Sequence, residues 1–218
     1  MKKVYFNEFN ILMDKTAYLP FNSGLLRAYA ETNQAIKSNY EFAPFLFHRD
    51  TPDKILESYD APDIAAFSVS MWNEQLSLKV AKEVKARWPE CVIIFGGPQI
   101  PHHPTDYLWE HPFIDITARG EGEESFTEIL EKRLGDSYYY GDINGISWRG
   151  FTDKCIHHNS DREQSKDLDI YPSPYLEDLF ESLFNKDLQF QAIIETNRGC
   201  PFPCSFCFWG QGGLSRKY

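Results

Sequence analysis

The chain has 218 residues, of which 42% are hydrophobic and 25% are charged, and it carries a formal net charge of -10 at pH 7. This length accommodates one sizeable domain and part of another, and the apolar content suffices for a core. The acidic balance argues against a nucleic-acid partner held through its phosphates, and no apolar run reaches the roughly eighteen residues that cross a bilayer. We therefore expect a cytoplasmic protein that acts on a small molecule or a peptide.

Apolar runs of strand length alternate with helical patterns along the first part of the chain. The runs cover residues 4–6, 42–47, 64–68, 92–95 and 114–117. Strands that alternate with helices in this way form parallel sheets with helices on both faces. The pattern therefore predicts an α/β domain with a doubly wound, parallel, five-stranded sheet.

Two of the segments between these runs carry clear helical signals. In residues 73–88, Asn73 can cap the first turn and Pro89 ends the helix. Residues 125–134 predict a second helix, with acidic residues near its start and Gly135 after its end. The sheet-facing stripe of the first helix consists of Leu76, Val80, Val84 and Trp88.

The chain after the fifth run changes character. Residues 143–157 contain two strand-like runs around a polar turn, which predicts a hairpin that connects and covers the neighbouring elements. Residues 161–169 are charged and are expected to be exposed. Cys91, at the start of a strand, and Cys155, in the hairpin, are interpreted as packed or idle thiols.

The loops that follow the last three predicted strands contain glycine and serine. In a doubly wound sheet, ligands bind outside the carboxyl ends of the strands, so these loops are candidate binding elements. Glycines let a backbone approach a flat, bulky ligand, and serine hydroxyls can hydrogen-bond to its polar edge. Ordinary turn formation is the alternative explanation. The candidate residues are Ser68, Ser70, Gly96, Gly97, Pro98, Gly120, Glu121 and Gly122.

Three cysteines near the end of the chain, Cys200, Cys204 and Cys207, follow the pattern C-x3-C-x2-C. Three thiolates suit three irons of a cubane cluster and leave the fourth iron open to bind a small molecule. A structural zinc would need a fourth ligand, and no second Cys-x-x-Cys or His pair follows before Tyr218; a thioredoxin-like redox pair would not need the third cysteine. Five cysteines, an odd number, and no signal peptide argue against a disulfide framework.

The run Glu195-Thr-Asn-Arg-Gly-Cys-Pro-Phe-Pro-Cys-Ser-Phe-Cys207 resembles the cluster motif of radical S-adenosylmethionine (SAM) enzymes. The resemblance implies that Cys200, Cys204 and Cys207 hold a [4Fe-4S] cluster whose fourth iron binds SAM. The reduced cluster of this family cleaves SAM to methionine and a 5'-deoxyadenosyl radical. The resemblance also implies that Phe206 lies near the SAM adenine, and that Arg198 and Gly199 shape the turn into the cluster loop.

Residues 95–99 (FGGPQ) and 118–125 (ARGEGEES) resemble the Rossmann- or flavodoxin-like cobalamin-binding domain that precedes the radical SAM barrel in one large subgroup. The resemblance implies that the corrin ring lies on the carboxyl edge of the sheet, facing the cluster, and that the eight loop residues named above contact cobalamin. No Asp-x-His-x-x-Gly motif follows the first strand, and His48 is not in that setting. We expect cobalamin without a histidine ligand, and we expect His102 and His103 to be exposed.

Residues 171–175 (YPSPY) resemble the linker that enters the barrel in this family, and residues 190–195 correspond to its first strand. We therefore divide the chain into a cobalamin-binding domain (1–140), a hairpin and linker (141–188) and the start of a radical SAM barrel (189–218). A full α/β barrel takes on the order of two hundred residues, yet the sequence ends at Tyr218. We expect a fragment that does not complete turnover alone.

Two cofactors together suggest a cobalamin-dependent radical SAM methyltransferase, acting on an unactivated carbon or a phosphinate phosphorus. The resemblance implies methylcobalamin as the methyl donor and flavodoxin or ferredoxin as the electron donor. One alternative is a radical SAM cyclase or rearrangement enzyme that keeps the cobalamin domain without methylating anything. Another is a cobalamin-binding carrier or sensor module without turnover, in which the cysteine motif is a remnant.

Overall fold

The computed structural model describes residues 1–184, 187–199, 202 and 205–206. Its centre is an eight-stranded sheet with the order β3-β1-β5-β6-β7-β8-β9, in which β4 also pairs with β1. The strands from β3 to β7 run parallel, and β8 and β9 run antiparallel to their neighbours. The strands are β1 (Lys2–Asn10), β3 (Tyr40–Phe42), β4 (Leu46–His48), β5 (Ile64–Ser68), β6 (Val92–Gly96), β7 (Ile116–Ala118), β8 (Ile146–Arg149) and β9 (Ile156–His158).

All five predicted strands are present, and the α/β class is confirmed. The run 42–47 forms two short strands instead of one, because Pro44 has no N–H to continue a ladder and the pairing with β1 shifts register there. In terms of the five predicted strands the order is 2-1-3-4-5, the flavodoxin-type order. Its switch point lies between β1 and β5, where a ligand-binding crevice is expected outside the carboxyl ends.

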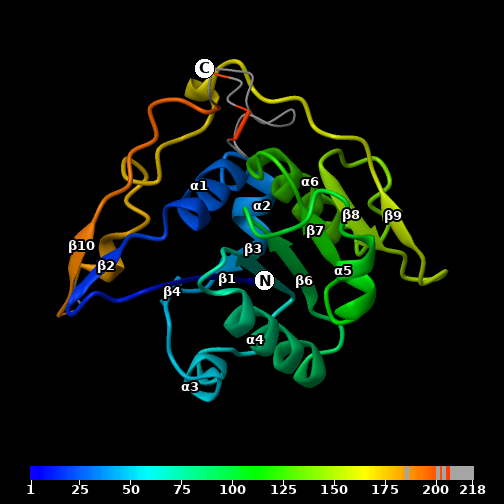
Figure 1. Ribbon diagram of the computed structural model, residues 1–218, viewed down its shortest axis with the longest axis horizontal. Coiled ribbons are helices and arrows are strands. Elements are labelled where there is room, and N and C mark those ends of the chain that lie inside the picture. The colour runs from blue at the N-terminus through cyan, green and yellow to red at the C-terminus, as the bar shows by residue number, and fades with distance from the viewer. Residues whose placement is uncertain (185–186, 200–201, 203–204, 207–218) are drawn as a thin grey trace.

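Helices cover both faces of the sheet (Figure 1). Three helices, α1 (Phe21–Ala30), α2 (Gln34–Asn39) and α6 (Glu123–Leu134), share one apolar core with alternate strand residues such as Val4 and Phe6. The other three, α3 (Pro52–Glu57), α4 (Glu74–Arg87) and α5 (Thr105–Glu110), share a second core with Tyr5 and Phe9. Because successive side chains of a strand point to opposite faces, one apolar run supplies both cores.

The predicted hairpin is present, but it does more than connect and cover. Strand β8 pairs antiparallel with β7, and β9 pairs with β8, so the hairpin extends the main sheet by two strands. An unpaired β7 would leave a row of free N–H and C=O groups at the edge of the sheet. The hairpin therefore completes the hydrogen bonding of the last parallel strand.

A second, two-stranded sheet lies on the far side of the molecule from the hairpin (Figure 1). It pairs β2 (Thr16–Tyr18) with β10 (Gln189–Gln191) in parallel. Two 3-10 turns, Leu168–Ile170 and Glu181–Leu183, precede β10. The strand expected at 190–195 is shorter and starts one residue earlier, because only Gln189, Phe190 and Gln191 pair with β2. Within the described ranges, no helix combines the length and apolar character needed to cross a bilayer.

Candidate functional site

The three loops predicted as binding elements meet at the carboxyl edge of the sheet. Asn73 fixes the first of them: its Oδ1 accepts from the Ser70 N–H at 2.8 Å, and its Nδ2 donates to the Ser68 carbonyl at 2.9 Å. The expected side-chain cap on α4 is therefore absent, because Asn73 begins that helix but its side chain is used by the loop. Ser70 is buried, while the Ser68 hydroxyl lies 3.5 Å from the Asn22 side-chain nitrogen.

Gly97, in the second loop, is required by the packing of two loops against each other. Its φ is +109°, and a Cβ added there would lie 2.6 Å from the carbonyl oxygen of Val69. The Val69 N–H donates to the Gly96 carbonyl at 2.6 Å, and the Gln99 N–H donates to the Val69 carbonyl at 3.2 Å. Gly97 is thus explained by the turn itself, the alternative that the sequence left open.

Gly120, in the third loop, is in a different situation. Its φ is +74°, so its backbone also favours glycine, but apart from its two chain neighbours no described residue has an atom within 4 Å of the position of an added Cβ. Gly122 is tighter, because a Cβ there would lie 3.1 Å from Leu26. Of these three glycines, Gly120 is therefore the one whose surroundings leave room for a ligand.

Glu121, between those glycines, uses its side chain inside the protein. Its carboxylate accepts from the Ser165 N–H at 2.9 Å and from the Tyr171 hydroxyl at 3.5 Å, and it lies 3.6 Å from a terminal nitrogen of Arg198. Only 11% of the side chain is exposed. Contact of Glu121 with cobalamin stays a prediction.

Arg198, two residues before Cys200, reaches the start of α6. Its guanidinium pairs with Glu123 at 2.6 Å and with Glu195 at 2.9 Å, and it stacks over the Tyr171 ring at 4.9 Å. Burial opposes the charge of Arg198, but the hydrogen bonds and charges of the two carboxylates outweigh it, so the pKa of the guanidinium is raised. Arg198 was expected only to shape the turn into the cluster loop, and nothing in the local sequence indicates its distant partners.

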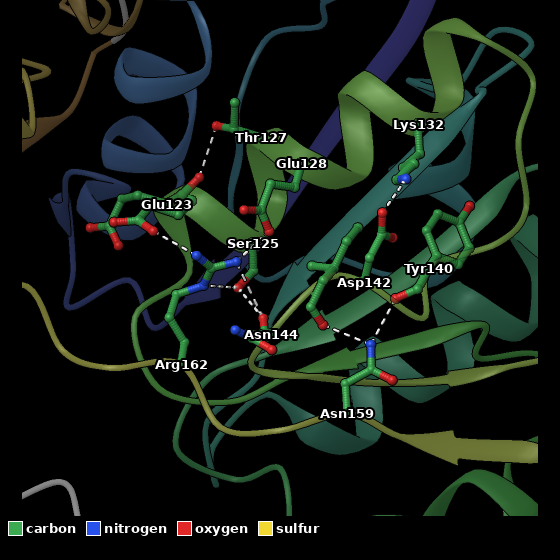
Figure 2. A network of polar contacts seen from close by, with 12 residues as sticks. Glu123, Ser125, Thr127, Glu128, Lys132, Tyr140, Asp142, Asn144, Asn159 and Arg162 are labelled. Atoms are coloured by element: carbon green, nitrogen blue, oxygen red, sulfur yellow. Dashed lines mark hydrogen bonds and ion pairs between the residues drawn. The ribbon is translucent and has the colours of Figure 1, made fainter.

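A second arginine, Arg162, binds the same helix (Figure 2). It pairs with Glu124 at 2.6 Å and with Glu128, and its Nε donates to the Ser125 hydroxyl at 3.0 Å. Only 13% of the side chain is exposed. The expectation that residues 161–169 are exposed is therefore wrong for Arg162, because its ion pairs with the carboxylates of α6 hold the side chain against the protein.

Three histidines lie close together where the β8–β9 hairpin approaches the loop after β6. His102 and His103 are exposed, as expected, and their rings lie 6.3 and 5.1 Å from the ring of His158. His158 shares a hydrogen bond with the Ser147 hydroxyl at 2.7 Å, and burial followed by the charge of Arg119 lowers its pKa. No group of three metal-binding side chains occurs among the described residues.

Glu8 is a buried acid that was not among the residues expected from the sequence, although a charge inside an apolar strand is a usable signal. Its carboxylate accepts from the Ser23 N–H at 2.9 Å and from the Ser23 hydroxyl at 2.8 Å, at the start of α1. Burial raises the pKa of Glu8 to about 7, although these hydrogen bonds oppose the shift. Glu8 thus titrates near neutral pH beside the switch point of the sheet.

The edge also presents apolar side chains to solvent. Met71 and Trp72, in the loop after β5, are 80% and 47% exposed. Phe206, the residue expected near the SAM adenine, is 90% exposed. Cys200, Cys204 and Cys207 lie outside the described residues, so their role as cluster ligands stays a prediction.

Comparison with known proteins places these features in context. The cobalamin-dependent radical SAM methyltransferase TokK of Streptomyces tokunonensis is 36% identical over 223 residues, which cover 100% of this chain and 32% of that protein. The 2-(S-pantetheinyl)-carbapenam-3-carboxylate methyltransferase of Streptantibioticus cattleyicolor is 36% identical over 98% of this chain and 31% of its own length. An anaerobic magnesium-protoporphyrin IX monomethyl ester cyclase of Synechocystis is 29% identical over 62% of this chain and 26% of its own length.

Among solved structures, the cobalamin-dependent SAM radical enzyme OxsB, with aqua-cobalamin and SAM bound, superposes with a TM-score of 0.70 at 22% identity. The match covers 95% of this chain and 28% of OxsB, and at this identity it supports the fold alone. No family model matches the chain. The chain spans about a third of the length of the curated relatives it matches. Because the sequence relatives, the strand order and the cysteine motif agree, the chain belongs to the family of cobalamin-dependent radical SAM enzymes.

Proposed function

We propose that this chain is the cobalamin-binding part of a radical SAM methyltransferase, together with the start of its cluster-binding domain. The observation that carries the proposal is the arrangement of the carboxyl edge. There the loop of Gly120 and Gly122 lies next to the segment that leads into the three cysteines, joined to it through Arg198. Two cofactors that act on one substrate must approach each other, and this edge brings their proposed binding segments together.

Several features of the described residues support the proposal of a large, flat ligand at this edge. The open space beside Gly120 admits close approach to the backbone, and Met71 and Trp72 offer exposed apolar surface in the loop after β5. The Ser68 hydroxyl is a polar group at the same edge. We propose that cobalamin binds here through the eight loop residues named from the sequence, without a histidine on cobalt.

The cysteine pattern fits a site-differentiated cluster, because three thiolates leave one iron of a [4Fe-4S] cluster open for SAM. When bound, the cluster supplies the electron that cleaves SAM, and cobalamin carries the methyl group that is transferred. In this proposal Cys200, Cys204 and Cys207 hold the irons, and Phe206 lies against the adenine. The exposure of Phe206 leaves its ring available for such a contact.

We also propose the division of the chain at residues 140 and 188, with the hairpin as an edge extension of the first unit. A flavodoxin or ferredoxin would supply electrons, and a cytoplasmic location would protect an oxygen-labile cluster. The substrate is proposed to be a small molecule or a peptide with an unactivated carbon. The carbapenam carboxylate named for one relative is the first compound to test.

The first experiment is an anaerobic optical titration of the chain with hydroxocobalamin. The proposal predicts saturable binding and a spectrum without nitrogen ligation of cobalt. Absence of binding would remove the main support for methyl transfer and leave a radical SAM segment whose first domain has another role.

A cyclase or rearrangement enzyme is the second candidate, because the sequence relatives include cyclases. The mass of the product distinguishes the two activities, since methylation adds one carbon. A cobalamin carrier without chemistry is separated by the iron content after anaerobic reconstitution, because a carrier needs no iron. A stoichiometric cluster would rule the carrier out.

A further inference from the structure

One guanidinium joins three parts of the chain that are far apart in sequence. Arg198 contacts Glu121 and Glu123 at the start of α6, Tyr171 in the linker, and Glu195 in its own segment. We call these five residues the Arg198 cluster. The side chains of Arg198, Glu121 and Glu123 are 14%, 11% and 5% exposed, so their charges interact with little screening by water.

The cluster holds three carboxylates around one cation. Removal of the cation would leave two buried carboxylates, Glu121 and Glu123, and the more exposed Glu195 facing each other, which is more costly than losing an exposed ion pair. Movement of the segment 195–199 away from the loop before α6 would relieve the repulsion between Glu195 and the other two. Arg198 is therefore a contact that favours the close approach of these two segments.

The geometry requires arginine and not merely a positive charge. The planar guanidinium presents several N–H groups in a fork, so it can bind carboxylates on two sides while its face stacks on Tyr171. A lysine ammonium is a compact point charge without such a face. The buried Glu121 Oε1 and Arg198 Nη1 have no hydrogen-bond partner among the described residues and lie 3.6 Å apart. The Nη1 group of the guanidinium can therefore donate a further hydrogen bond to Glu121 after a small movement.

We infer that Arg198 is a positioning residue that couples the two cofactor sites, because it fixes the Gly120–Gly122 loop and the segment before Cys200 to each other. This inference rests on the proposed function for the identity of the two cofactors. It predicts that the order of the segment before the cysteines and the affinity of the edge for cobalamin change together when Arg198 is replaced.

The first test needs no cofactor. Hydrogen exchange of the complete chain is measured by mass spectrometry for the wild type, Arg198→Met and Arg162→Met. The control is matched, since Arg162 is 13% exposed, binds two carboxylates of the same helix and, within the described part of the chain, forms no hydrogen bond or ion pair with residues 193–199. Arg198→Met is expected to raise exchange about tenfold or more at two hydrogen-bonded amides beside the cluster, the Ser165 N–H, which donates to Glu121, and the Ile193 N–H, which donates to the Tyr175 hydroxyl. Arg162→Met is expected to leave exchange at Ile193 unchanged. Unchanged exchange at Ile193 in Arg198→Met would overturn the inference.

The second test adds hydroxocobalamin under anaerobic conditions to the same proteins. Arg198→Met is expected to raise the dissociation constant for hydroxocobalamin about tenfold, and Arg198→Lys is expected to raise it by less. Arg162→Met is expected to raise it by no more than about twofold. Equal affinity of the wild type and Arg198→Met would refute the coupling while the proposed function stands. If the wild type itself does not bind, the proposed function fails, and hydrogen exchange still decides the structural role of Arg198. Arg198→Lys keeps the charge and replaces the Met variant in both assays if circular dichroism shows that Arg198→Met is unfolded.

Discussion

Replacement of Glu8 by glutamine is expected to stabilise the protein by about 3 kcal/mol at pH 8 and by less than about 1 kcal/mol at pH 5. Glu8 is fully enclosed between β1 and the start of α1, and burial raises its pKa from 4.5 to about 7. The folded state therefore binds a proton more tightly than the unfolded state. Folding free energy is lost as pH rises through this interval, because the ionised carboxylate has to be held without water.

The size of the effect follows from the two pKa values. A difference of about 2.5 units, from 4.5 to about 7, corresponds to about 3 kcal/mol at 1.36 kcal/mol per unit. The penalty is absent below about pH 4.5, grows between the two values and is complete above about pH 7. Glutamine resembles the protonated acid and can still accept hydrogen bonds from Ser23, so Glu8→Gln removes the penalty without leaving Ser23 unpaired.

The assay is urea unfolding followed by tryptophan fluorescence at pH 5, 6, 7 and 8, with the difference in unfolding free energy between Glu8→Gln and the wild type as the readout. The exposed Glu57 provides the control, because Glu57→Gln alters a solvated side chain and is expected to change stability by less than about 0.5 kcal/mol at each pH. A difference between Glu8→Gln and the wild type that stays constant from pH 5 to pH 8 would refute the reasoning.

Four further substitutions test the loops and the hairpin. Gly97→Ala is expected to lower the free energy of unfolding in urea by about 2–4 kcal/mol, because the φ of +109° and the backbone atom 2.6 Å from the new Cβ both oppose a side chain there. Gly120→Ala, in open space, is expected to lower it by only about 1 kcal/mol. Equal losses would contradict the distinction between the two glycines. Asn73→Ala is expected to cost about 1–2 kcal/mol and to raise hydrogen exchange at residues 68–70, since two backbone groups lose their partner; unchanged exchange there would show that the loop does not depend on this side chain. His158 should titrate below 6.5 in NMR, and Arg119→Met should move its midpoint upward, because burial and then the Arg119 charge lower its pKa; a midpoint unmoved by the substitution would eliminate Arg119 as a cause.

The sheet could be predicted because its strands are buried on both faces and so leave apolar runs in the sequence. Val4 and Phe6 face one core while Tyr5 faces the other, and this double burial is what makes the first run unbroken. The break at Pro44 and the pairing of the hairpin with β7 were missed for different reasons. The first depends on a missing N–H within an otherwise apolar run, and the second on an unpaired edge that exists only after the sheet has formed.

The candidate site could be predicted only in part. Loop positions at the carboxyl edge follow from where each predicted strand ends, so Ser68, Gly96 and Gly120 could be named without knowing the strand order. The reason why each residue is needed could not be predicted. Gly97, for example, is required by its contact with the backbone of Val69, and such contacts leave no periodic pattern in the sequence. The pairing of Arg198 with Glu123 likewise joins residues that only the folded chain brings together.

The pairing of β2 with β10 has a consequence for the order of folding. Residues 16–18 find their partner strand only at residues 189–191, so this sheet closes a loop that contains nearly the whole α/β domain. Contacts with such a large sequence separation form late, because their chain entropy is repaid only after the enclosed segment is compact. During synthesis, β2 leaves the ribosome first, and its backbone N–H and C=O groups have no strand partner until β10 has been synthesised. The α/β domain is therefore expected to fold before the segment that approaches the cysteines is fastened to it.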